Sequence, residues 1–363
     1  MKSTNRLKEW LIKNKVLAMI VAGSLVLAGS GVAVYLLVIR EPVQPDYPIA
    51  QDDDPDYEPE PPEPIIWRAN LTGRIVETEA EQNAAVTAIM IENSMQARPQ
   101  SGLKEAGLVF ESEAEGGITR FFAFYQSEKP EIIGPVRSLR TYNIDWAAGF
   151  QATLVYYGGS AASLQLAGSG AFRTFGGNFL PASAHWRAAD RWAPHNVYTS
   201  FERLDALNRE RGFLTSDFVG FARKDDEPAE APNATNVRLN VSHMAAFSSR
   251  FRWDPETNRY FRYQGADPHI DREHGHIAPN VVVGMIVDQR LVYEDGWRNQ
   301  IHTVGSGRAY FFQDGTVTVG RWRQTARDVA LEFLDEEGNA FALNRGQTWI
   351  VAVPSGRGSV SWE

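Results

Sequence analysis

The chain has 363 residues, of which 43% are hydrophobic, 11% are aromatic and none is cysteine, with 45 acidic and 36 basic side chains. The lack of cysteine excludes a disulfide-stapled miniprotein, a cysteine-ligated zinc or iron–sulfur centre and any thiol nucleophile. The aromatic content excludes a fully disordered chain, and the length predicts two soluble domains of about 100–200 residues each.

The N-terminal 40 residues predict a membrane anchor. Residues 1–15 form a basic tail, and residues 16–39 carry no formal charge and are rich in valine, leucine, isoleucine and alanine. At about 1.5 Å per residue, a helix over this segment crosses the roughly 30 Å hydrocarbon core of a membrane. Since basic flanks stay on the cytoplasmic side, we expect a single-pass protein of the cell membrane with a cytoplasmic N-terminus and extracytoplasmic globular domains.

We expect the apolar segment to be retained, because it is longer than the roughly 7–15 apolar residues of a signal peptide. The sequence Leu27-Ala28-Gly29-Ser30 is similar to a bacterial lipobox, but Ser30 stands where the acylated cysteine would be. Without a thiol, thioether lipidation at this position is chemically impossible. A cleaved signal is the alternative, and finding only a shortened protein in the culture medium would support it.

Residues 40–69 are predicted to form a disordered linker. The part over 41–64 contains eight prolines, nine acids and no base. Such a segment lacks amide donors and repels itself, which favours an extended polyproline II spacer. Its simplest role is to hold the folded part away from an anionic surface, and specific binding by the acidic run is the alternative.

Residues 70–224 are predicted to form a mixed α/β sandwich. Ser138 and Ser160 are candidate helix N-caps, and Thr199-Ser200-Phe201-Glu202 has the spacing of a capping box. The expected strands cover 84–92, 108–114, 118–126 and 153–157, with a hairpin turn at 115–117, and the expected helices cover 139–150, 160–167 and 199–212.

An acidic, proline-containing linker over 225–235 is predicted to separate this domain from a second one over 236–363. The second domain is expected to be mostly antiparallel β, which makes the whole an α+β protein behind one transmembrane helix. Its strand-like runs are separated by turn residues and cover 237–241, 247–253, 259–264, 280–287, 308–312, 316–319, 329–334 and 348–353.

Several short motifs, in a fixed order, carry a resemblance to a known family. They are ARPQSGL (97–103), EGGITR (115–120), IGPVRS (133–138), APHN (193–196), TVGSG (303–307) and GQTWI (346–350). Together they resemble the YerB-like lipoproteins, which are bacterial envelope proteins with two domains of unknown function. The resemblance spans about residues 84–354 and implies an extracytoplasmic location and two domains. It supplies no catalytic residues, and the family's usual lipid anchor is replaced here by Ser30 and an apolar helix.

Arginine outnumbers lysine strongly after residue 65, which suits bidentate recognition of phosphate or carboxylate, although composition bias explains much of it. Arg137 and Arg140 are predicted to lie beside a helix N-terminus, where free amides favour anions. Pairing of either with Glu111, Glu113 or Glu115 is the alternative. These glutamates alternate, so a strand would place them on one face. Glu111 and Glu115, with Arg120, are therefore further pocket candidates.

Other candidate ligand contacts lie in loops and motifs. His195 and Asn196 precede the helix that starts near residue 199, and an imidazole there can shuttle protons, contact a ligand or hold the loop. Arg98, in the first shared motif, and Ser160 complete the set of ligand-binding candidates. Ser160 is not a nucleophile elbow, because no glycine follows two residues later.

A metal site is not expected, and no cofactor is predicted. The segment 268–276 holds three imidazoles and two carboxylates, so His269, Asp271, His274 and His276 are weak candidates for a divalent metal. A polar loop between strands is the favoured interpretation. No P-loop, dinucleotide-binding glycine pattern or zinc-protease motif occurs, and an acidic exported domain is a poor partner for nucleic acid.

The sequence identifies no reaction, so whether the protein is an enzyme stays open. The favoured function is a membrane-anchored cell-envelope protein that binds an anionic ligand or a partner protein, such as a component of the wall or of its synthesis. The alternative is an enzyme acting on a polyprenyl-phosphate-linked or glycan substrate of the cell wall, with Arg137 and Arg140 on the phosphate.

Overall fold

The computed structural model describes residues 64–292 and 298–363. The predicted basic tail, transmembrane helix and most of the acidic linker therefore lie outside the described residues. The end of the predicted linker is folded, because Trp67–Arg68 (β1) pairs with Ile75–Val76 (β2) and Ala69 is buried. Within the described residues, no helix is long and apolar enough to cross a membrane.

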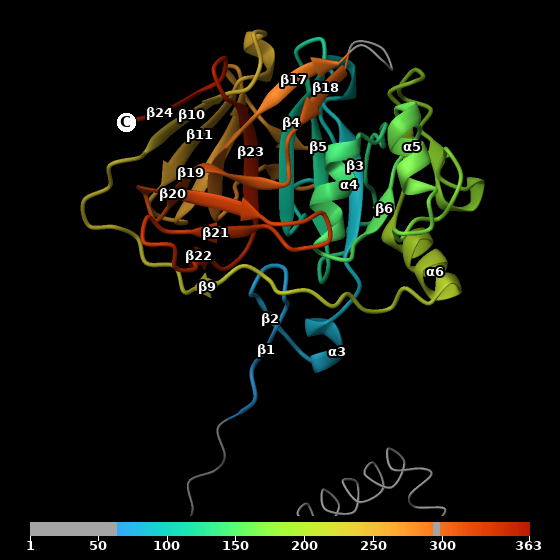
Figure 1. The fold of residues 1–363 in the computed structure, drawn as a ribbon, viewed down its shortest axis with the longest axis horizontal. Coiled ribbons are helices and arrows are strands. Elements are labelled where there is room, and N and C mark those ends of the chain that lie inside the picture. The colour runs from blue at the N-terminus through green and yellow to red at the C-terminus, as the bar shows by residue number, and fades with distance from the viewer. Residues whose placement is uncertain (1–63, 293–297) are drawn as a thin grey trace, which may run out of the picture. The chain divides into compact units, whose positions relative to one another are not determined.

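A nine-stranded mixed sheet runs through the centre of the fold (Figure 1). Its middle strands are apolar on both faces, as expected for a sheet that is covered on both sides. In spatial order the strands are β21 (Glu332–Leu334), β20 (Thr316–Gln324), β19 (Gly305–Gln313), β16 (Val281–Val287), β23 (Thr348–Pro354), β4 (Leu108–Glu115), β5 (Ile118–Tyr125), β3 (Thr87–Glu92) and β6 (Thr153–Val155).

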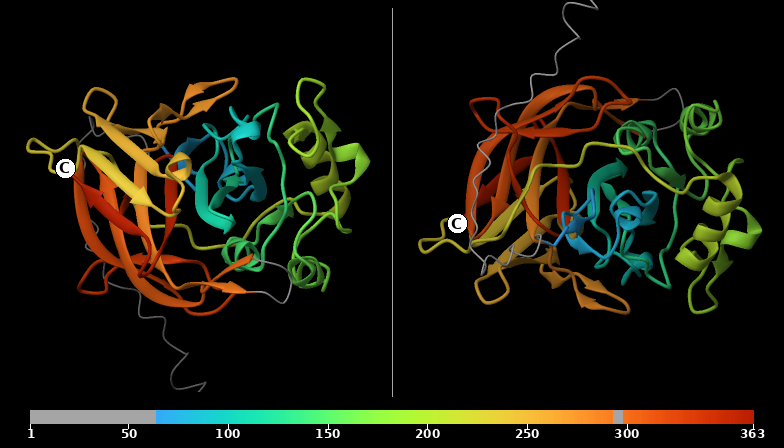
Figure 2. Two further views of the ribbon diagram at one scale, coloured as in Figure 1. Left: turned by 90° about the horizontal axis from the view of Figure 1, so that it is seen from above. Right: turned by 90° about the horizontal axis from the view of Figure 1, so that it is seen from below.

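The two regions that the sequence distinguishes meet inside this sheet. Strand β23 pairs in parallel with β4, in a register that sets Thr348 opposite Leu108 and Val351 opposite Glu111. Residues 64–363 accordingly form one compact unit. In Figure 2 the segment that carries α5 and α6 and the last strands of the chain lie on opposite sides of the β3–β4–β5 strands.

A separate five-stranded antiparallel sheet covers part of the large one. Its inward side chains, among them Val237, Phe251 and Tyr260, share a buried apolar cluster with Ile89 and Val109 of the nine-stranded sheet. Its outward side chains alternate with them and are polar in β10 and β11, whereas β12 also places Phe261 and Tyr263 outward. The strands in order are β13 (Asp267–Pro268), β12 (Arg259–Gln264), β11 (Ser249–Asp254), β10 (Asn236–Asn240) and β24 (Ser359–Trp362).

Two helices begin where a serine side chain accepts a hydrogen bond from a backbone N–H group of the first turn. Ser160 caps α5 (Ala161–Ala167), and Ser200 caps α6 (Phe201–Arg211), which ends at a left-handed Gly212. The predicted Ser160 cap is confirmed, whereas the cap of α6 lies one residue after Thr199, the first residue of the predicted capping box. The Ser138 cap is wrong, because α4 (Thr141–Ala148) starts after Arg140, whose amide donates to Asn143 Oδ1. On one face of the sheet, Trp146 of α4 stacks on Phe110 with ring centroids 4.5 Å apart.

The remaining described elements are short. They are α3 (Glu79–Gln82), three 3₁₀ turns (η1, Met95–Ala97; η2, Ala182–Ala184; η3, Ala245–Phe247) and small strand pairs: β7 (Trp186–Arg187) with β8 (Val197–Tyr198), β9 (Arg223–Lys224) with β22 (Leu343–Asn344), β14 (Ile270–Asp271) with β15 (Gly275–His276) and β17 (Gln289–Val292) with β18 (Arg298–Ile301).

The predicted fold class holds in outline: the chain is a mixed α/β protein with one large mixed sheet and a separate antiparallel sheet. The second region departs from a purely antiparallel arrangement, because β16 and β23 pair in parallel with each other. The short strands around residues 270–301 were not predicted, since their two-residue to four-residue runs carry little periodicity.

Candidate functional site

Three of the predicted site residues meet at one edge of the nine-stranded sheet. Strands β3, β4 and β6 run in the same direction, so their carboxyl ends share this edge, where open α/β sheets commonly bind ligands. Glu115, at the end of β4, lies between Arg120 of β5 and Arg140 at the start of α4. Arg120 NH2 is 2.7 Å from Glu115 Oε1, and Arg140 NH2 is 2.6 Å from Glu115 Oε2.

The pair of arginines shifts the acidity of the carboxyl group between them. Burial raises the pKa of Glu115, but the charges and hydrogen bonds of Arg120 and Arg140 outweigh it and hold that pKa below its usual value. Burial, with a contribution from the charge of the neighbouring Arg140, lowers the pKa of Arg120 to about 10. Arg120 and Arg140 share the single negative charge of Glu115, so the alternative interpretation of Arg140, pairing with a strand glutamate, is the one the structure shows.

The glutamates of β4 do not share one face as predicted. A β-bulge between Glu113 and Glu115 shifts the register of β4 against β5, so the alternation is broken there. Glu115 therefore reaches Arg140 beside α4. Glu111 instead points to the five-stranded sheet and pairs with Arg262, and Glu113 pairs with Arg357 at 2.8 Å.

A second group of predicted residues surrounds Glu92 at the end of β3. Glu92 is almost fully buried, and its Oε1 lies 2.9 Å from His195 Nδ1 and accepts a hydrogen bond of 2.8 Å from Ser94. Arg137 Nε is 3.3 Å from Glu92 Oε2. The carboxylate thus fixes the imidazole ring through Nδ1 and leaves Nε2 on the side away from Glu92.

The remaining ligand candidates make structural contacts. Arg98 donates to Asn93 Oδ1 and to the carbonyl of Ala246, and Ser160 caps α5 through Ser163 N. Asn196 donates to the carbonyls of Ala188 and Arg191 and accepts from Arg187. A hollow of about 170 Å³ lies beside Arg140; its lining is Arg140, Thr141, Ser160, Ala162, Val292, Arg298, Asn299 and Gln300.

The four weak metal candidates point in different directions. His269 is buried, and burial and the charge of Arg262 hold the pKa of His269 well below its usual range. The Asp271 carboxylate accepts hydrogen bonds from backbone N–H groups. His274 lies 3.1 Å from Glu105, and His276 donates a hydrogen bond to the carbonyl of Arg262. Among residues 64–292 and 298–363, no group of three or more His, Asp or Glu side chains is placed to hold a metal ion.

A fully buried ion pair ties the two sheets together. Neither Glu111 nor Arg262 is exposed, and Arg262 NH2 donates to both oxygens of Glu111 at 2.8 and 2.7 Å. Trp349 Nε1 donates to the same carboxylate, and its ring lies 4.6 Å from the guanidinium carbon of Arg262. Arg262 NH1 also contacts His269 Nδ1. Because Arg262 is buried and paired in this way, it is not available to an external ligand.

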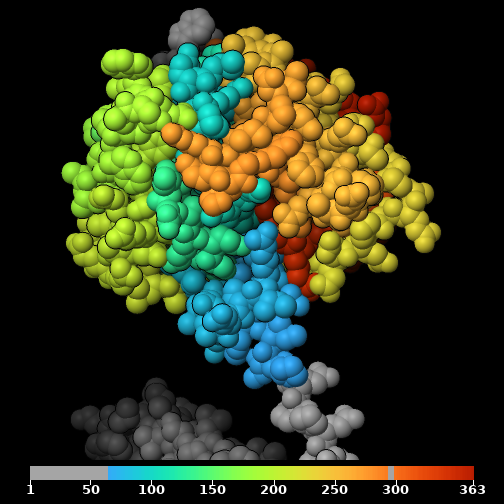
Figure 3. All heavy atoms as spheres, turned by 180° about the vertical axis from the view of Figure 1, so that it is seen from behind, coloured from blue at the N-terminus to red at the C-terminus, as the bar shows by residue number. Residues whose placement is uncertain are grey.

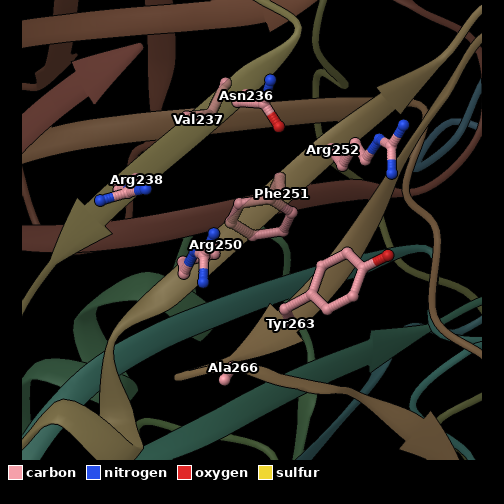
Figure 4. A pocket seen from close by; sticks show the side chains of 8 residues that line it. All are labelled: Asn236, Val237, Arg238, Arg250, Phe251, Arg252, Tyr263 and Ala266. Carbon is pink, nitrogen blue, oxygen red and sulfur yellow. The ribbon is translucent and has the colours of Figure 1, made fainter. Parts of the chain in front are cut away.

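Unpaired arginines lie instead on the outer face of the five-stranded sheet (Figure 4). Arg238 of β10 is opposite Arg250 of β11, and Arg252 is two residues further along β11. Arg250 donates to the carbonyl of Gly265, whereas Arg238 and Arg252 have no ion-pair or side-chain hydrogen-bond partner among the described residues. They border a hollow of about 300 Å³, lined by Asn236, Val237, Arg238, Arg250, Phe251, Arg252, Tyr263 and Ala266.

Among the described residues, the lining of this hollow contains three arginines and no carboxylate, so the hollow is positively charged. The candidate anion site is therefore this outer face, defined by Arg238, Arg250, Arg252 and Tyr263, and it was not predicted. The signal was present in the sequence, because Arg250-Phe251-Arg252 places two arginines on the same side of a strand. The cross-strand register that adds Arg238 is not readable from a local pattern.

Comparisons with known proteins agree on one family. A model described as the N-terminal domain of a protein of unknown function (DUF3048) matches residues 71–214, and the model of the corresponding C-terminal domain matches residues 237–350. A Bacillus subtilis protein named "Putative lipoprotein YerB" is 32% identical over 297 residues, which are 79% of this chain and 86% of that protein. The crystal structure of YerB protein from Bacillus subtilis superposes with a TM-score of 0.72 at 29% identity and covers 81% of this chain and 99% of that one.

Proposed function

Because the chain belongs to the family of YerB-like proteins with paired DUF3048 regions, we propose that it is an extracytoplasmic cell-envelope protein that binds an anionic ligand. Its relative is named as a lipoprotein, and here residues 16–39 would take the place of the lipid, since Ser30 offers no thiol. The ligand would lie on the outer face defined by Arg238, Arg250, Arg252 and Tyr263.

The observation that carries this proposal is the set of uncompensated guanidinium groups on that face. Side chains directly opposite each other on neighbouring strands lie about 5 Å apart at their Cβ atoms, so Arg238 and Arg250 repel one another when no anion is present. A phosphate or carboxylate relieves this repulsion and accepts paired N–H bonds from each guanidinium. Tyr263, opposite Arg250, adds a flat ring beside the charges.

The direct test measures binding of fluorescently labelled inorganic polyphosphate to the full-length chain in detergent by fluorescence anisotropy. We expect the Arg238→Gln, Arg250→Gln, Arg252→Gln variant to bind at least about tenfold more weakly, because a tenfold change needs only about 1.4 kcal/mol from three charged contacts. These residues lie at the surface, so the variant should unfold at the same temperature as the wild type.

A matched control removes the same charge elsewhere. Arg203, Arg209 and Arg211 all lie on α6, and their replacement by glutamine should leave polyphosphate affinity within about twofold of wild type. Poly-L-glutamate, titrated in parallel, separates a preference for phosphate from a preference for any polyanion. Equal losses in the two triple variants would show that net charge, not the outer face, causes binding, and the proposed site would be wrong.

The proposed location makes a separate prediction. Alkaline phosphatase fused after Glu363 should be active in intact bacteria, because that enzyme folds only outside the cytoplasm and the basic flank keeps the N-terminus inside. A matched fusion of a fluorescent protein that matures only in the cytoplasm should stay dark. The opposite pair of results would place the folded part inside the cell and remove the envelope from the proposal.

The alternative enzymatic function has one observation in its favour, the imidazole of His195 held through Nδ1 by Glu92. Such a pair suits proton transfer at Nε2. Of the two arginines assigned to a substrate phosphate, however, Arg140 already binds Glu115 through two nitrogens. Protection of the wild type against heat by a polyprenyl phosphate, lost in Arg137→Gln, would favour the enzyme.

A further inference from the structure

A second hollow, of about 530 Å³, lies where the two family regions meet. In Figure 3 the N-terminal blue segment, teal parts of the first region and orange and red parts of the second region lie side by side on one face. The hollow shares no residue with the outer face defined above. Its lining is Arg74, Lys104, Glu105, Glu128, Arg259, His274, Ala278, Asn280, Arg345 and Gln347.

The side chains that line this hollow carry more positive than negative charge. Arg74 pairs with Glu128 at 2.5 Å, Arg345 pairs with the exposed Asp225, and Lys104 Nζ donates to the carbonyl of His274. The guanidinium of Arg259 has no ion-pair or hydrogen-bond partner among the described residues, although it is only partly exposed. Four cationic side chains thus line the hollow against two carboxylates, Glu128 and Glu105. Two further carboxylates act from outside the lining, Asp225 on Arg345 and Asp226 on Arg259.

Behind this lining, a further arginine, Arg223, adds another positive charge. Arg223 packs with Arg345 against Gly73, and its guanidinium donates only to neutral groups, namely the carbonyls of Leu71 and Asn344 and the hydroxyl of Thr348. Burial, with a contribution from the charge of Arg74, lowers the pKa of Arg223 to about 9. Burial also lowers the pKa of Arg259, again with a contribution from Arg74. The protein therefore holds these cations together against their mutual repulsion.

We propose that this hollow binds a small multivalent anion of the phosphate class, held between Arg74, Arg259 and Arg345. The three guanidinium groups come from different parts of the chain, Arg74 beside β2, Arg259 at the start of β12 and Arg345 after β22. An oxyanion with several oxygens can accept paired N–H bonds from all three guanidinium groups at once. Because its contacts come from both family regions, the bound anion stabilises their junction.

The test is isothermal titration of the full-length chain in detergent with sodium pyrophosphate, together with the unfolding temperature at each concentration. We expect saturable binding and an unfolding temperature that rises with ligand, as required for a ligand that binds only the folded state. Arg259→Gln should weaken pyrophosphate binding at least tenfold. It should leave the unfolding temperature without ligand unchanged, because the Arg259 guanidinium makes no ion pair or hydrogen bond among the described residues. Inorganic phosphate, titrated in the same way, should bind more weakly.

The outer-face variant with Arg238, Arg250 and Arg252 replaced by glutamine is the matched control, since it should retain wild-type pyrophosphate affinity. Loss of pyrophosphate binding in that variant, with retention in Arg259→Gln, would move the anion to the outer face and overturn this inference. Absence of saturable pyrophosphate binding to the wild type would also overturn it. Absence of pyrophosphate binding leaves polyphosphate binding by the outer face untouched, and loss of polyphosphate binding there leaves this hollow untouched, so the two proposals can fail separately.

Discussion

Arg262→Met is expected to lower the free energy of unfolding by about 3–5 kcal/mol, the largest single-residue effect that we anticipate. The substitution leaves Glu111 as an uncompensated buried charge, because both of its oxygens face Arg262 and neither residue is exposed. It also removes the cation that lies over the ring of Trp349. The measurement is denaturant unfolding of the full-length chain in detergent, followed by tryptophan fluorescence.

A double-mutant cycle separates the ion pair from general damage to the core. Glu111→Leu alone leaves Arg262 buried without its carboxylate, so it should also destabilise strongly. Glu111→Leu with Arg262→Met removes both charges and should be less destabilised than the sum of the two single variants, by at least about 2 kcal/mol. The exposed Arg252→Met is the matched control and should change stability by less than about 0.5 kcal/mol. Strict additivity in the cycle would contradict the buried pair.

Glu115→Gln is expected to cost about 2–3 kcal/mol at neutral pH, because it removes the one carboxylate that two largely buried arginines share. This loss is smaller than for a fully buried pair, because the Glu115 side chain is 31% exposed and solvent screens its charge. Glutamine preserves shape and can still accept a hydrogen bond, so the effect reports chiefly the lost charge. Glu210→Gln on the exposed side of α6 is the control and should be neutral.

The cost of Glu115→Gln should depend on pH in a defined direction. The arginines hold the folded-state pKa of Glu115 below its usual value of 4.5, so the charged pair stabilises the fold above that value. As pH falls through the lowered pKa, the wild type takes up this proton and loses the stabilisation. The stability difference between wild type and variant should therefore be largest above about pH 5 and shrink toward pH 3. A difference that stays constant over this range would contradict the assignment.

Local sequence patterns were sufficient for much of the secondary structure. Alternating and apolar runs predicted β4, β5, β12 and β23 to within a residue or two. The Ser160 cap of α5 fell where expected, and the cap of α6 is one residue after the Thr199 of the predicted capping box. The joining of the two regions through β23 and β4 could not be predicted in this way. Trp349 and Glu111, which meet there, are 238 residues apart, and no local pattern encodes which strand edge a distant strand will find.

The candidate site shows a similar division. Arginine-rich composition indicated anion recognition, and the arginines that stood near glycine and glutamate motifs were the natural candidates. The fold pairs Arg120 and Arg140 with Glu115, which the bulge in β4 turns away from the side of Glu111. The unpaired cations lie on a solvent-facing strand surface, where charged residues are common for reasons of solubility alone. Only the register of β10 against β11 shows that Arg238 and Arg250 meet without an acid between them.

The salt dependence of polyphosphate binding shows whether Arg238, Arg250 and Arg252 form an anion-binding face. Binding through these guanidinium groups releases counterions, so the logarithm of the association constant should fall linearly with the logarithm of the salt concentration. We expect the slope for the triple glutamine variant to be smaller than that for wild type by about two, and the slope for the α6 control to be unchanged. Identical slopes for the wild type and the outer-face variant would contradict the claim.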